Sequence, residues 1–222
     1  MSRQTRKCGG VAILTHESLQ VNKSKVIKLS NSTCEMQILY IENLNLHIIN
    51  IYRPPDTTSE KFKECIDEAE RYLKNVKMTD NIMLIGDYNF PFLRWREVND
   101  SVIHDVISGG TCDEQAQAQA LLNIADKHFL NQVITEPTRL KNTMDLVFLN
   151  DTNLLGNIKV EEVSNHISDH NLIIADINSN IPNPTVEQRN ENSSKLSNFN
   201  YWSEKADWEG MNNYFKNIPW HE

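Results

Sequence analysis

The sequence predicts an α/β protein built from layered strands and helices. Short apolar runs rich in Ile, Val, Leu and Tyr are typical of strands, and two longer segments carry apolar residues at helical spacing. Strand, helix and strand follow one another in the first half of the chain, an order that favours a layered core. Polar residues stand at the ends of several strands, where such folds gather catalytic groups at one rim.

The first half of the chain begins with strands and continues into a helix. Strands are expected at Val11–Leu14, Met36–Ile41 and Leu46–Tyr52. Asn43-Leu44-Asn45 predicts a hairpin turn between the second and third, and Pro54-Pro55-Asp56 ends the third. A helix then opens at Thr57-Thr58-Ser59. Its apolar face consists of Phe62, Ile66, Ala69, Tyr72, Leu73 and Val76.

The second half of the chain continues the alternation. Asn81–Ile85 predicts a buried strand that stops at Gly86, and apolar spacing predicts a helix over Asp113–Phe129. Further strands are expected at Asp145–Leu149, Val160–Val163 and Leu172–Ile177. Between these elements, Phe92–Thr111 is expected to be a loop that faces a nucleic-acid groove.

The predicted organisation has three parts. Residues 1–177 form one α/β domain. Residues 178–200 are rich in Asn, Ser, Pro and Glu, which predicts a linker. Residues 201–222 regain aromatic side chains and predict a tail helix that leads toward a downstream domain. The apolar side of that helix consists of Trp208, Met211, Phe215 and Ile218.

Composition excludes several classes of protein. The 222 residues are 39% hydrophobic and 23% charged, which is enough for a buried core. Four widely spaced cysteines form no C-x-x-C pair, so a disulfide framework or a zinc knuckle is not expected. The chain shows no signal peptide and no apolar run approaching the roughly 20 residues of a membrane span. These features predict an intracellular protein without a membrane partner.

The charge balance gives little information about partners. A net charge of −8 argues against broad, sequence-independent adhesion to nucleic acid, which depends on clustered Lys and Arg. An enzyme that acts on one scissile phosphate needs only a local basic rim. Candidates for such a rim, each equally consistent with an ordinary solvated charge, are Arg53, Arg94, Arg96, Arg139 and Lys141.

Two acidic motifs at strand ends point to phosphodiester chemistry, which needs a positioned water, an acid or base, and positive charge near the phosphate. Asp87, after a buried strand, could deprotonate the water, and Asn89 could hydrogen-bond a phosphate oxygen. His170, beside Asp169, could donate a charged hydrogen bond to the phosphate. A carboxylate partner such as Asp145 would favour the imidazolium form and orient it.

Taken singly, each motif also fits a structural role. A Gly-Asp pair after a strand is common in plain turns. His166 and His170 are spaced like a helical zinc pair, but their flanks predict strands and therefore argue against a zinc site. The order and spacing of five motifs is more specific than any one of them. These motifs are Gly9-Gly10-Val11-Ala12-Ile13, Ile51-Tyr52-Arg53-Pro54-Pro55, Gly86-Asp87-Tyr88-Asn89-Phe90-Pro91, Thr138 with Asn142-Thr143-Met144-Asp145-Leu146, and Ser168-Asp169-His170.

In this order the motifs resemble the endonuclease/exonuclease/phosphatase superfamily, and within it the apurinic-type endonuclease domain of jockey-like non-LTR retrotransposons. The resemblance covers roughly Cys8 to Ile177. It implies a two-sheet sandwich with helices on its outer faces, a four-layer αββα arrangement. It also implies a magnesium-dependent site, with manganese as an alternative, that nicks DNA. A reverse transcriptase would be encoded downstream, and an enzyme acting on genomic DNA would be nuclear.

The resemblance also implies roles for individual residues. Tyr52 would contact the phosphate, Asp87 would activate water, and Asn89 would orient the phosphate. Asp145 and His170 match the carboxylate and histidine pair of the superfamily. Asp169 matches the acid close to the metal and the leaving group. His170 and Asn142 complete the set of residues expected to bind substrate.

One departure from the superfamily pattern is large. Its members carry a strand with an Asn, a helix, and a strand ending in the principal metal-binding Glu before the Gly-Gly-Val stretch. Here that stretch starts at Gly9, so the first strand and helix are expected to be missing and activity impaired. Glu17 and Glu35 lie outside matching motifs. A catalytically silent remnant, a nucleic-acid or protein binding module, and an enzyme for small phosphoesters remain alternatives.

Overall fold

The computed structural model describes residues 10–22, 27–29, 34–99, 101–106, 109–164 and 168–178. The chain divides into two units, Met1–Asn180 and Ile181–Glu222, and all described residues belong to the first. The linker predicted from residue 178 onward lies outside the described residues apart from Asn178 itself. The tail helix predicted over 201–222 also lies outside them, as does His166.

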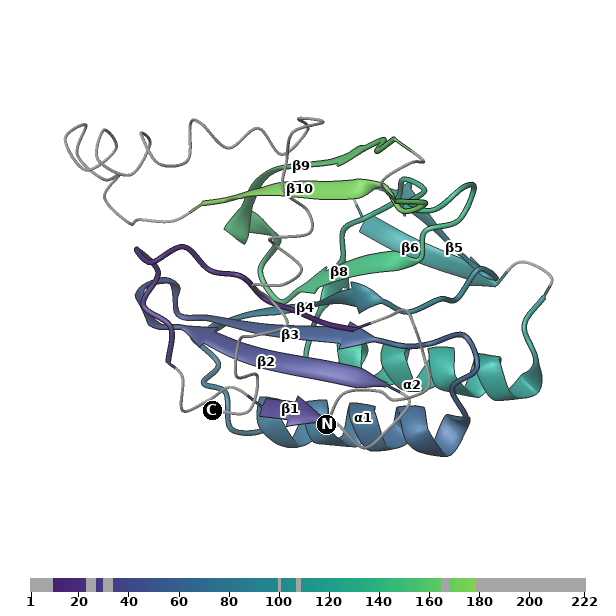
Figure 1. Cartoon of the computed structure of the whole chain (residues 1–222), viewed down its shortest axis with the longest axis horizontal. Helices are drawn as coiled ribbons and strands as arrows, with labels where there is room; N and C mark the ends of the chain where they lie inside the picture. Colours follow the sequence, from purple (N-terminus) through teal and green to yellow (C-terminus); the bar gives the residue numbers. More distant parts are fainter. Residues whose placement is uncertain are drawn as a thin grey trace, which may run out of the picture. The chain divides into compact units, whose positions relative to one another are not determined.

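A six-stranded sheet with the order β1-β2-β3-β4-β8-β7 forms the centre of the first unit (Figure 1). β3 and β4 run parallel and the other neighbouring strands run antiparallel. The parallel pair requires a crossover connection, which α1 supplies between β3 and β4. The strands are β1 Ile27–Leu29, β2 Glu35–Ile41, β3 Leu46–Tyr52, β4 Asn81–Asp87, β7 Asn131–Gln132 and β8 Asp145–Leu149.

Two helices, α1 Ser59–Leu73 and α2 Cys112–Lys127, pack on one face of this sheet (Figure 1). Their apolar residues form one core cluster with alternate residues of the strands, because successive strand side chains point to opposite faces. α2 starts with a capping box between Thr111 and Glu114. Neither of these helices, the only α-helices of the described residues, is long and apolar enough to cross a membrane.

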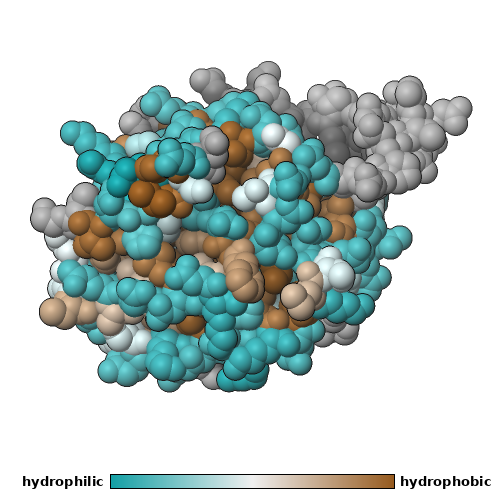
Figure 2. Space-filling model, turned by 180° about the vertical axis from the view of Figure 1, so that it is seen from behind, coloured by the Kyte–Doolittle hydropathy of each residue, from teal (hydrophilic) through white to brown (hydrophobic). Residues whose placement is uncertain are grey.

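The opposite face of the sheet is covered by the antiparallel pair β9 Leu155–Glu161 and β10 Leu172–Ile177 (Figure 1). A second apolar cluster lies between the two layers and includes Met83, Val147 and Leu149 of the sheet. The predicted α/β class with two layers of sheet and flanking helices is therefore confirmed. Among the described residues, however, both helices lie on the same side of the large sheet. Figure 2 shows hydrophobic side chains lying in recesses between hydrophilic ones on the face seen from behind.

Val11–Leu14 was predicted as a strand, and that prediction is wrong. These residues form no strand ladder, although the N–H of Val11 donates to Glu35 Oε2 at 3.2 Å. Further along the same segment a single bridge joins Val21 to Ile41. A short apolar run becomes a strand only when a neighbouring strand pairs with it, and the run alone does not determine whether one does.

Residues 92–111 were predicted to be a loop, but they contain the hairpin of β5 Leu93–Val98 and β6 Ser101–Val106. Leu93 and Trp95 are buried, whereas the alternate residues Arg94 and Arg96 are exposed. Buried and exposed residues alternate at the start of β5, but the strand has only six residues and its exposed positions are charged. The hairpin therefore gives a weak apolar signal in the sequence.

Several element boundaries also differ from the predictions. α1 ends at Leu73 before Val76, and α2 ends at Lys127, so that Phe129 follows the helix with φ 55° and is 78% exposed. β4 extends through Asp87, two residues beyond the predicted strand end. β9 covers 155–161 in place of the predicted 160–163.

Candidate active site

Three polar side chains lie in one row across the rim of the large sheet. Tyr52 of β3 pairs with Asp87 of β4, and Asp87 pairs with Asp145 of β8. Directly opposed residues of neighbouring strands place their side chains on the same face, here the face away from the helices. The row continues to Glu35 of β2, which pairs with Tyr52. Sequence motifs alone did not connect Glu35 with this rim.

His170 reaches the row from the loop that precedes β10. Its Nδ1 lies 2.8 Å from Asp145 Oδ2, and both side chains are about three-quarters buried, with 24% and 25% exposure. This contact fixes the orientation of the ring and leaves Nε2 as the ring nitrogen that does not contact Asp145. The N–H of His170 donates to Ser168 Oγ at 3.0 Å, which shapes the loop.

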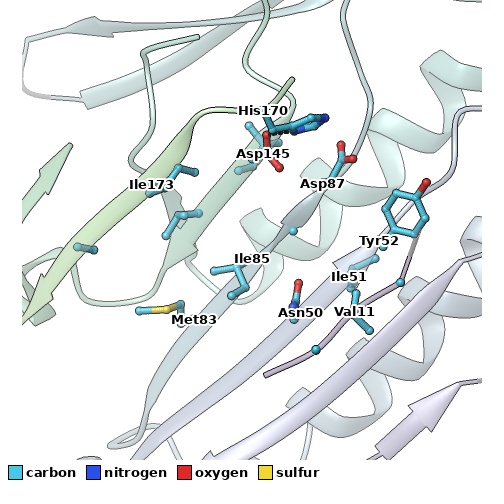
Figure 3. A pocket seen from close by; sticks show the side chains of 16 residues that line it. Val11, Asn50, Ile51, Tyr52, Met83, Ile85, Asp87, Asp145, His170 and Ile173 are labelled. Atoms are coloured by element: carbon cyan, nitrogen blue, oxygen red, sulfur yellow. Dashed lines mark hydrogen bonds and ion pairs between the residues drawn. The ribbon is translucent and has the colours of Figure 1, made fainter. Parts of the chain in front are cut away.

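Asp87, Asp145 and His170 form a compact cluster (Figure 3). One potential ligand atom from each of the three residues lies within 4.8 Å of those of the other two. Proximity of the two carboxylates has an electrostatic consequence. Burial, followed by the charge of Asp145, raises the pKa of Asp87 from 3.8 to about 6, although His170 and Asn89 partly oppose the shift.

The cluster opens into a cavity of about 590 Å³ between the large sheet and β10. Figure 3 shows the carboxylate of Asp87 and the phenol of Tyr52 at one end of the cavity, near Asp145 and His170. Met83, Ile85 and Ile173 line the other end. The cavity therefore combines a polar, acidic end with an apolar end.

Gly86 fixes how closely β4 approaches β3 beside the cluster. Its φ is 150°, and a Cβ built at this position would lie 1.8 Å from the carbonyl oxygen of Ile51. A side chain cannot fit in this space, so only glycine allows the backbone to approach this closely. The glycine in the Gly86-Asp87 motif is thus required by the backbone that presents Asp87.

Thr138 supports Asp145 from below, a role that the sequence motif did not reveal. The threonine is fully buried, and its Oγ1 accepts hydrogen bonds from the N–H groups of Met144 and Asp145, both at 2.9 Å. Its carbonyl oxygen accepts the N–H of Asn171 at 2.7 Å. Thr138 therefore links the start of β8 to the loop that carries His170.

Asn89 lies beneath the rim, in a tight turn. The residue is 6% exposed with φ 51°, and its Nδ2 donates to the carbonyl oxygen of Arg53 at 2.9 Å. Its backbone N–H donates to Asp87 Oδ1 at 3.2 Å. Asn89 does not line the cavity, so in this structure it contacts the site through Asp87.

Asp169 and Asn142 lie near the cluster but outside the lining of the cavity. Asp169 is exposed, and its Oδ2 lies 2.5 Å from Nη2 of Arg139, a contact that lowers the pKa of Asp169. Asn142 closes a tight turn by exchanging backbone hydrogen bonds with Arg139. This turn places Leu140 at its exposed tip, with φ 54°.

The predicted basic rim changes in one respect. Arg53 is fully buried, so it cannot take part in an exposed rim, and that expectation is wrong. Arg94 and Arg96 are exposed on β5, where Arg96 pairs with Asp105 of β6. Arg139 is 35% exposed in its side chain and remains close to the site through its contact with Asp169.

The donor set of the cluster fits a divalent cation. Two carboxylates supply the hard oxygen ligands that Mg²⁺ and Mn²⁺ prefer, and an imidazole is acceptable to Mn²⁺. A cation beside Asp87 and Asp145 would also neutralise the repulsion that raises the pKa of Asp87. The structure therefore supports Asp87 and Asp145 as candidate ligands, while Asp169 is held by Arg139.

Comparison with known proteins identifies the class to which this fold and site belong. Residues 46–174, more than half of the chain, match the family described as endonuclease-reverse transcriptase. The chain belongs to the endonuclease-reverse transcriptase family, and the resemblance to the endonuclease/exonuclease/phosphatase superfamily is confirmed. Among curated proteins, none matches this chain at a significant level.

Two solved structures to which this chain is similar illustrate the comparison. The endonuclease domain of TRAS1, a telomere-specific non-LTR retrotransposon, is 18% identical, with a TM-score of 0.46. That match covers 74% of this chain and 71% of the other. The human Nocturnin catalytic domain with bound sulfate is 13% identical, with a TM-score of 0.43, over 72% of this chain and 60% of the other.

Proposed function

We propose that this chain is a magnesium-dependent endonuclease domain that nicks DNA. The observation that carries the proposal is the cluster of Asp87, Asp145 and His170 at the sheet rim, in a chain of the endonuclease-reverse transcriptase family. Tyr52 lies in the same row of side chains. The four residues supply the acid, base and hydrogen-bond donors that phosphodiester hydrolysis needs.

Asp87 acts as the base that orients and deprotonates the attacking water. Without a bound cation its pKa of about 6 lies close to neutral pH, where a base combines a useful ionised fraction with useful basicity. Burial is the largest cause of this raised pKa, and that cause remains when a cation offsets the charge of Asp145. The backbone N–H of Asn89 holds one oxygen of Asp87, which leaves the other to face the cavity. Asn89 orients the phosphate only if its side chain turns away from the carbonyl of Arg53.

His170 and Asp145 act as a pair on the phosphate. The contact between Nδ1 and Asp145 fixes the orientation of the ring, so Nε2 can donate a hydrogen bond to a phosphate oxygen. The phenol of Tyr52 and the amide of Asn142 are proposed as further contacts to the substrate. Exposed Arg139 adds positive charge beside them.

Asp87 and Asp145 would hold the metal ion. The family resemblance assigns this role to Asp169, which is the alternative ligand. When bound, Mg²⁺ would stabilise charge on the phosphate and leaving oxygens. The lining of the cavity supplies only two carboxylates as metal ligands, Asp87 and Asp145. We therefore also propose that metal affinity is weak and that nuclease activity is impaired. Manganese, which accepts imidazole more readily, is expected to give equal or greater activity.

DNA is proposed as the substrate, on the basis of the family, whose description joins an endonuclease to a reverse transcriptase. A reverse transcriptase encoded on the same polypeptide is accordingly the proposed partner. Acting on genomic DNA would place the protein in the nucleus. The net charge of −8 is compatible with this substrate because few phosphates need to be contacted near a scissile bond.

The test is conversion of supercoiled plasmid to the nicked circle in the presence of Mg²⁺ or Mn²⁺. Asp87→Asn and His170→Gln should each lower the rate by about 10²- to 10⁴-fold. His104→Gln, which changes an exposed histidine of β6, is the matched control and should leave the rate unchanged.

Equal nicking by wild type and both site variants would overturn the proposal. Bis(p-nitrophenyl) phosphate, assayed in parallel, separates the substrate alternatives. Turnover of this small ester that depends on Asp87, without any plasmid nicking, would assign the site to small phosphoesters. Absence of both activities, together with binding of DNA, would support a silent binding module.

A further inference from the structure

We propose that Arg53 is a positioning residue that holds the Asp87–Asn89 turn in the geometry required by the site. The inference rests on the proposed function for its catalytic consequence, but its structural part stands independently. Arg53 follows β3 directly and lies outside the cavity lining, so it acts through the turn and not on the substrate. Nothing in the family comparison assigns this role.

Four hydrogen bonds join Arg53 to the three residues of the turn. The N–H of Arg53 donates to the carbonyl oxygen of Asp87 at 2.9 Å. Its Nη1 donates to the carbonyl oxygens of Tyr88 at 3.1 Å and Asn89 at 3.2 Å. In return, Nδ2 of Asn89 donates to the carbonyl oxygen of Arg53 at 2.9 Å. Every residue of the turn is therefore tied to the same arginine.

The burial of Arg53 argues that its charge has a specific use. The residue is 0% exposed, and its guanidinium carbon lies 4.4 Å from the centre of the Phe90 ring. Burial of a charge is costly, and an apolar residue of similar size is often at least as stabilising at such a position. A charged donor, however, makes stronger hydrogen bonds to carbonyl oxygens than a neutral one. Arginine can also direct several bonds in one plane.

The turn has one specific backbone geometry. Asn89 has φ 51°, in the left-handed region that Asn adopts more readily than most other residues except Gly. Its N–H must point at Asp87 Oδ1, which lies 3.2 Å away. Holding the carbonyl group of Tyr88 fixes the peptide plane that contains this N–H, and holding that of Asn89 fixes the next peptide plane. Arg53 thereby orients the carboxylate of Asp87 toward the cavity.

Gln117 of α2 holds Arg53 from the other side. Its Oε1 accepts a hydrogen bond from Nε of Arg53 at 2.6 Å. Its Nε2 donates hydrogen bonds to the carbonyl oxygen of Thr57 and to Asp113 Oδ2, both at 2.8 Å. Gln117 is 1% exposed, so these contacts are shielded from water. The amide links the first turns of α2 to the loop after β3. Through Gln117 and Arg53, the packing of α2 against the sheet determines the position of Asp87.

The test compares Arg53→Met with Ile49→Val. Methionine removes the guanidinium but keeps an unbranched chain, and Ile49→Val removes one methylene group from the helix-facing side of the same strand as a control for lost stability. Amide hydrogen exchange is measured at Asn89 and at Ile38 of β2, at a temperature where both variants are folded by circular dichroism. Plasmid nicking is measured under the same conditions.

Arg53→Met should accelerate exchange of the Asn89 amide at least about 10-fold more than that of Ile38, because local geometry is lost and not global stability alone. The kcat for nicking should fall about 10- to 100-fold, with KM within about 3-fold, since a misplacement of about 1 Å can cost that much. Ile49→Val should accelerate exchange of the Asn89 amide no more than that of Ile38, which lies directly opposite the substitution, and should leave kcat unchanged. Equal exchange at the two amides in Arg53→Met, with unchanged kcat, would overturn the proposal.

Two further variants keep the outcome interpretable. Arg53→Lys retains the charge but not the planar donors, so it should resemble Arg53→Met; full recovery of Asn89 protection and kcat would contradict the need for the guanidinium. If Arg53→Met fails to fold, Gln117→Met keeps the guanidinium but removes the acceptor of Nε, together with the two hydrogen bonds that Nε2 of Gln117 donates, and should cause the same local exchange. If the wild type does not nick DNA, the proposed function fails, but the exchange data still decide the role of Arg53.

Discussion

Asp87 and Asp145 lie directly opposite each other on β4 and β8, and this pairing places two carboxylates side by side at the sheet rim. Together with burial, the charge of Asp145 raises the pKa of Asp87 to about 6. Neighbouring carboxylates are unfavourable for stability unless a proton or a cation separates them. A pair retained at such a cost is a common sign of a functional site.

The first prediction concerns stability and pH. Because the pKa of folded Asp87 is raised, its protonated form is favoured by folding, and that stability is present below about pH 4 and lost as pH rises through about 6. Asp87→Asn should therefore be more stable than wild type at pH 7.5, by about 1–3 kcal/mol. The advantage should shrink between pH 6 and 4, as measured by urea unfolding.

Comparing the two proteins at each pH matters because other carboxylates shift the opposite way. Asp169 and Asp105, both exposed and paired with arginines, have lowered pKa values. Asp105→Asn serves as the control, since it removes a carboxylate without touching the cluster. A pH-independent difference between Asp87→Asn and wild type would show that neither burial nor the charge of Asp145 raises the pKa of Asp87.

The second prediction concerns cation binding. Mg²⁺ or Mn²⁺ should raise the melting temperature of the wild type, because a ligand that binds only the folded state stabilises it, by about 2.7 kcal/mol at 100 times its Kd. Asp145→Asn should abolish the shift, whereas Asp169→Asn should keep it, since Asp169 pairs with Arg139. Differential scanning calorimetry across a cation titration measures both effects.

An exposed carboxylate of β10, Asp176, provides the control for nonspecific binding, and Asp176→Asn should behave like wild type. Loss of the shift in Asp169→Asn with its retention in Asp145→Asn would assign the metal to Asp169, as the family resemblance does. No shift in the wild type at millimolar cation would remove the metal site from the described cluster.

The third prediction concerns Thr138. Thr138→Val keeps the shape but removes the acceptor shared by the N–H groups of Met144 and Asp145, and an unsatisfied buried group costs about 1–3 kcal/mol. Denaturant unfolding should show a loss of this size. Thr138→Ser retains the hydroxyl and should lose less. Equal stability of the valine and wild-type proteins would mean that the two N–H groups find another acceptor.

The fourth prediction concerns Gly86. Gly86→Ala places a Cβ against the carbonyl oxygen of Ile51, which is backbone and cannot move aside cheaply. We expect a loss of at least about 2 kcal/mol or failure to fold. Gly156→Ala is the matched control, because its Cβ would meet the side chain of Asn178, which can rotate. Similar melting temperatures for the two variants would contradict the close approach of β4 to β3.

Much of the fold was predictable because its signals are local. Leu46–Tyr52, Asp145–Leu149 and Leu172–Ile177 agree with β3, β8 and β10 to the residue. These runs are apolar and bounded by polar or turn residues. The β5–β6 hairpin was missed because Arg94 and Arg96 occupy its exposed positions, and Val11–Leu14 was wrongly predicted because pairing depends on a partner strand.

The site was predictable in its residues but not in its geometry. Asp87, Asp145, His170 and Tyr52 were singled out by motif order, and the structure brings all four to one cavity. Their roles in catalysis stay predictions. Thr138 and Arg53 belong to the quoted motifs, but their supporting roles were not predicted, because their hydrogen bonds run to backbone groups of distant segments.

The sequence by itself determined the α/β class, most strands and helices, and the residues at the strand ends, since hydrophobic periodicity and turn chemistry are properties of neighbouring residues. Only the tertiary structure decided that Asp87 lies opposite Asp145 and that Arg53 is buried beneath the turn, whereas the contact of His170 with Asp145 was already expected from the sequence. Register between strands and burial depend on how segments pack together. The raised pKa of Asp87 follows from that packing, because a pKa responds to burial and nearby charge.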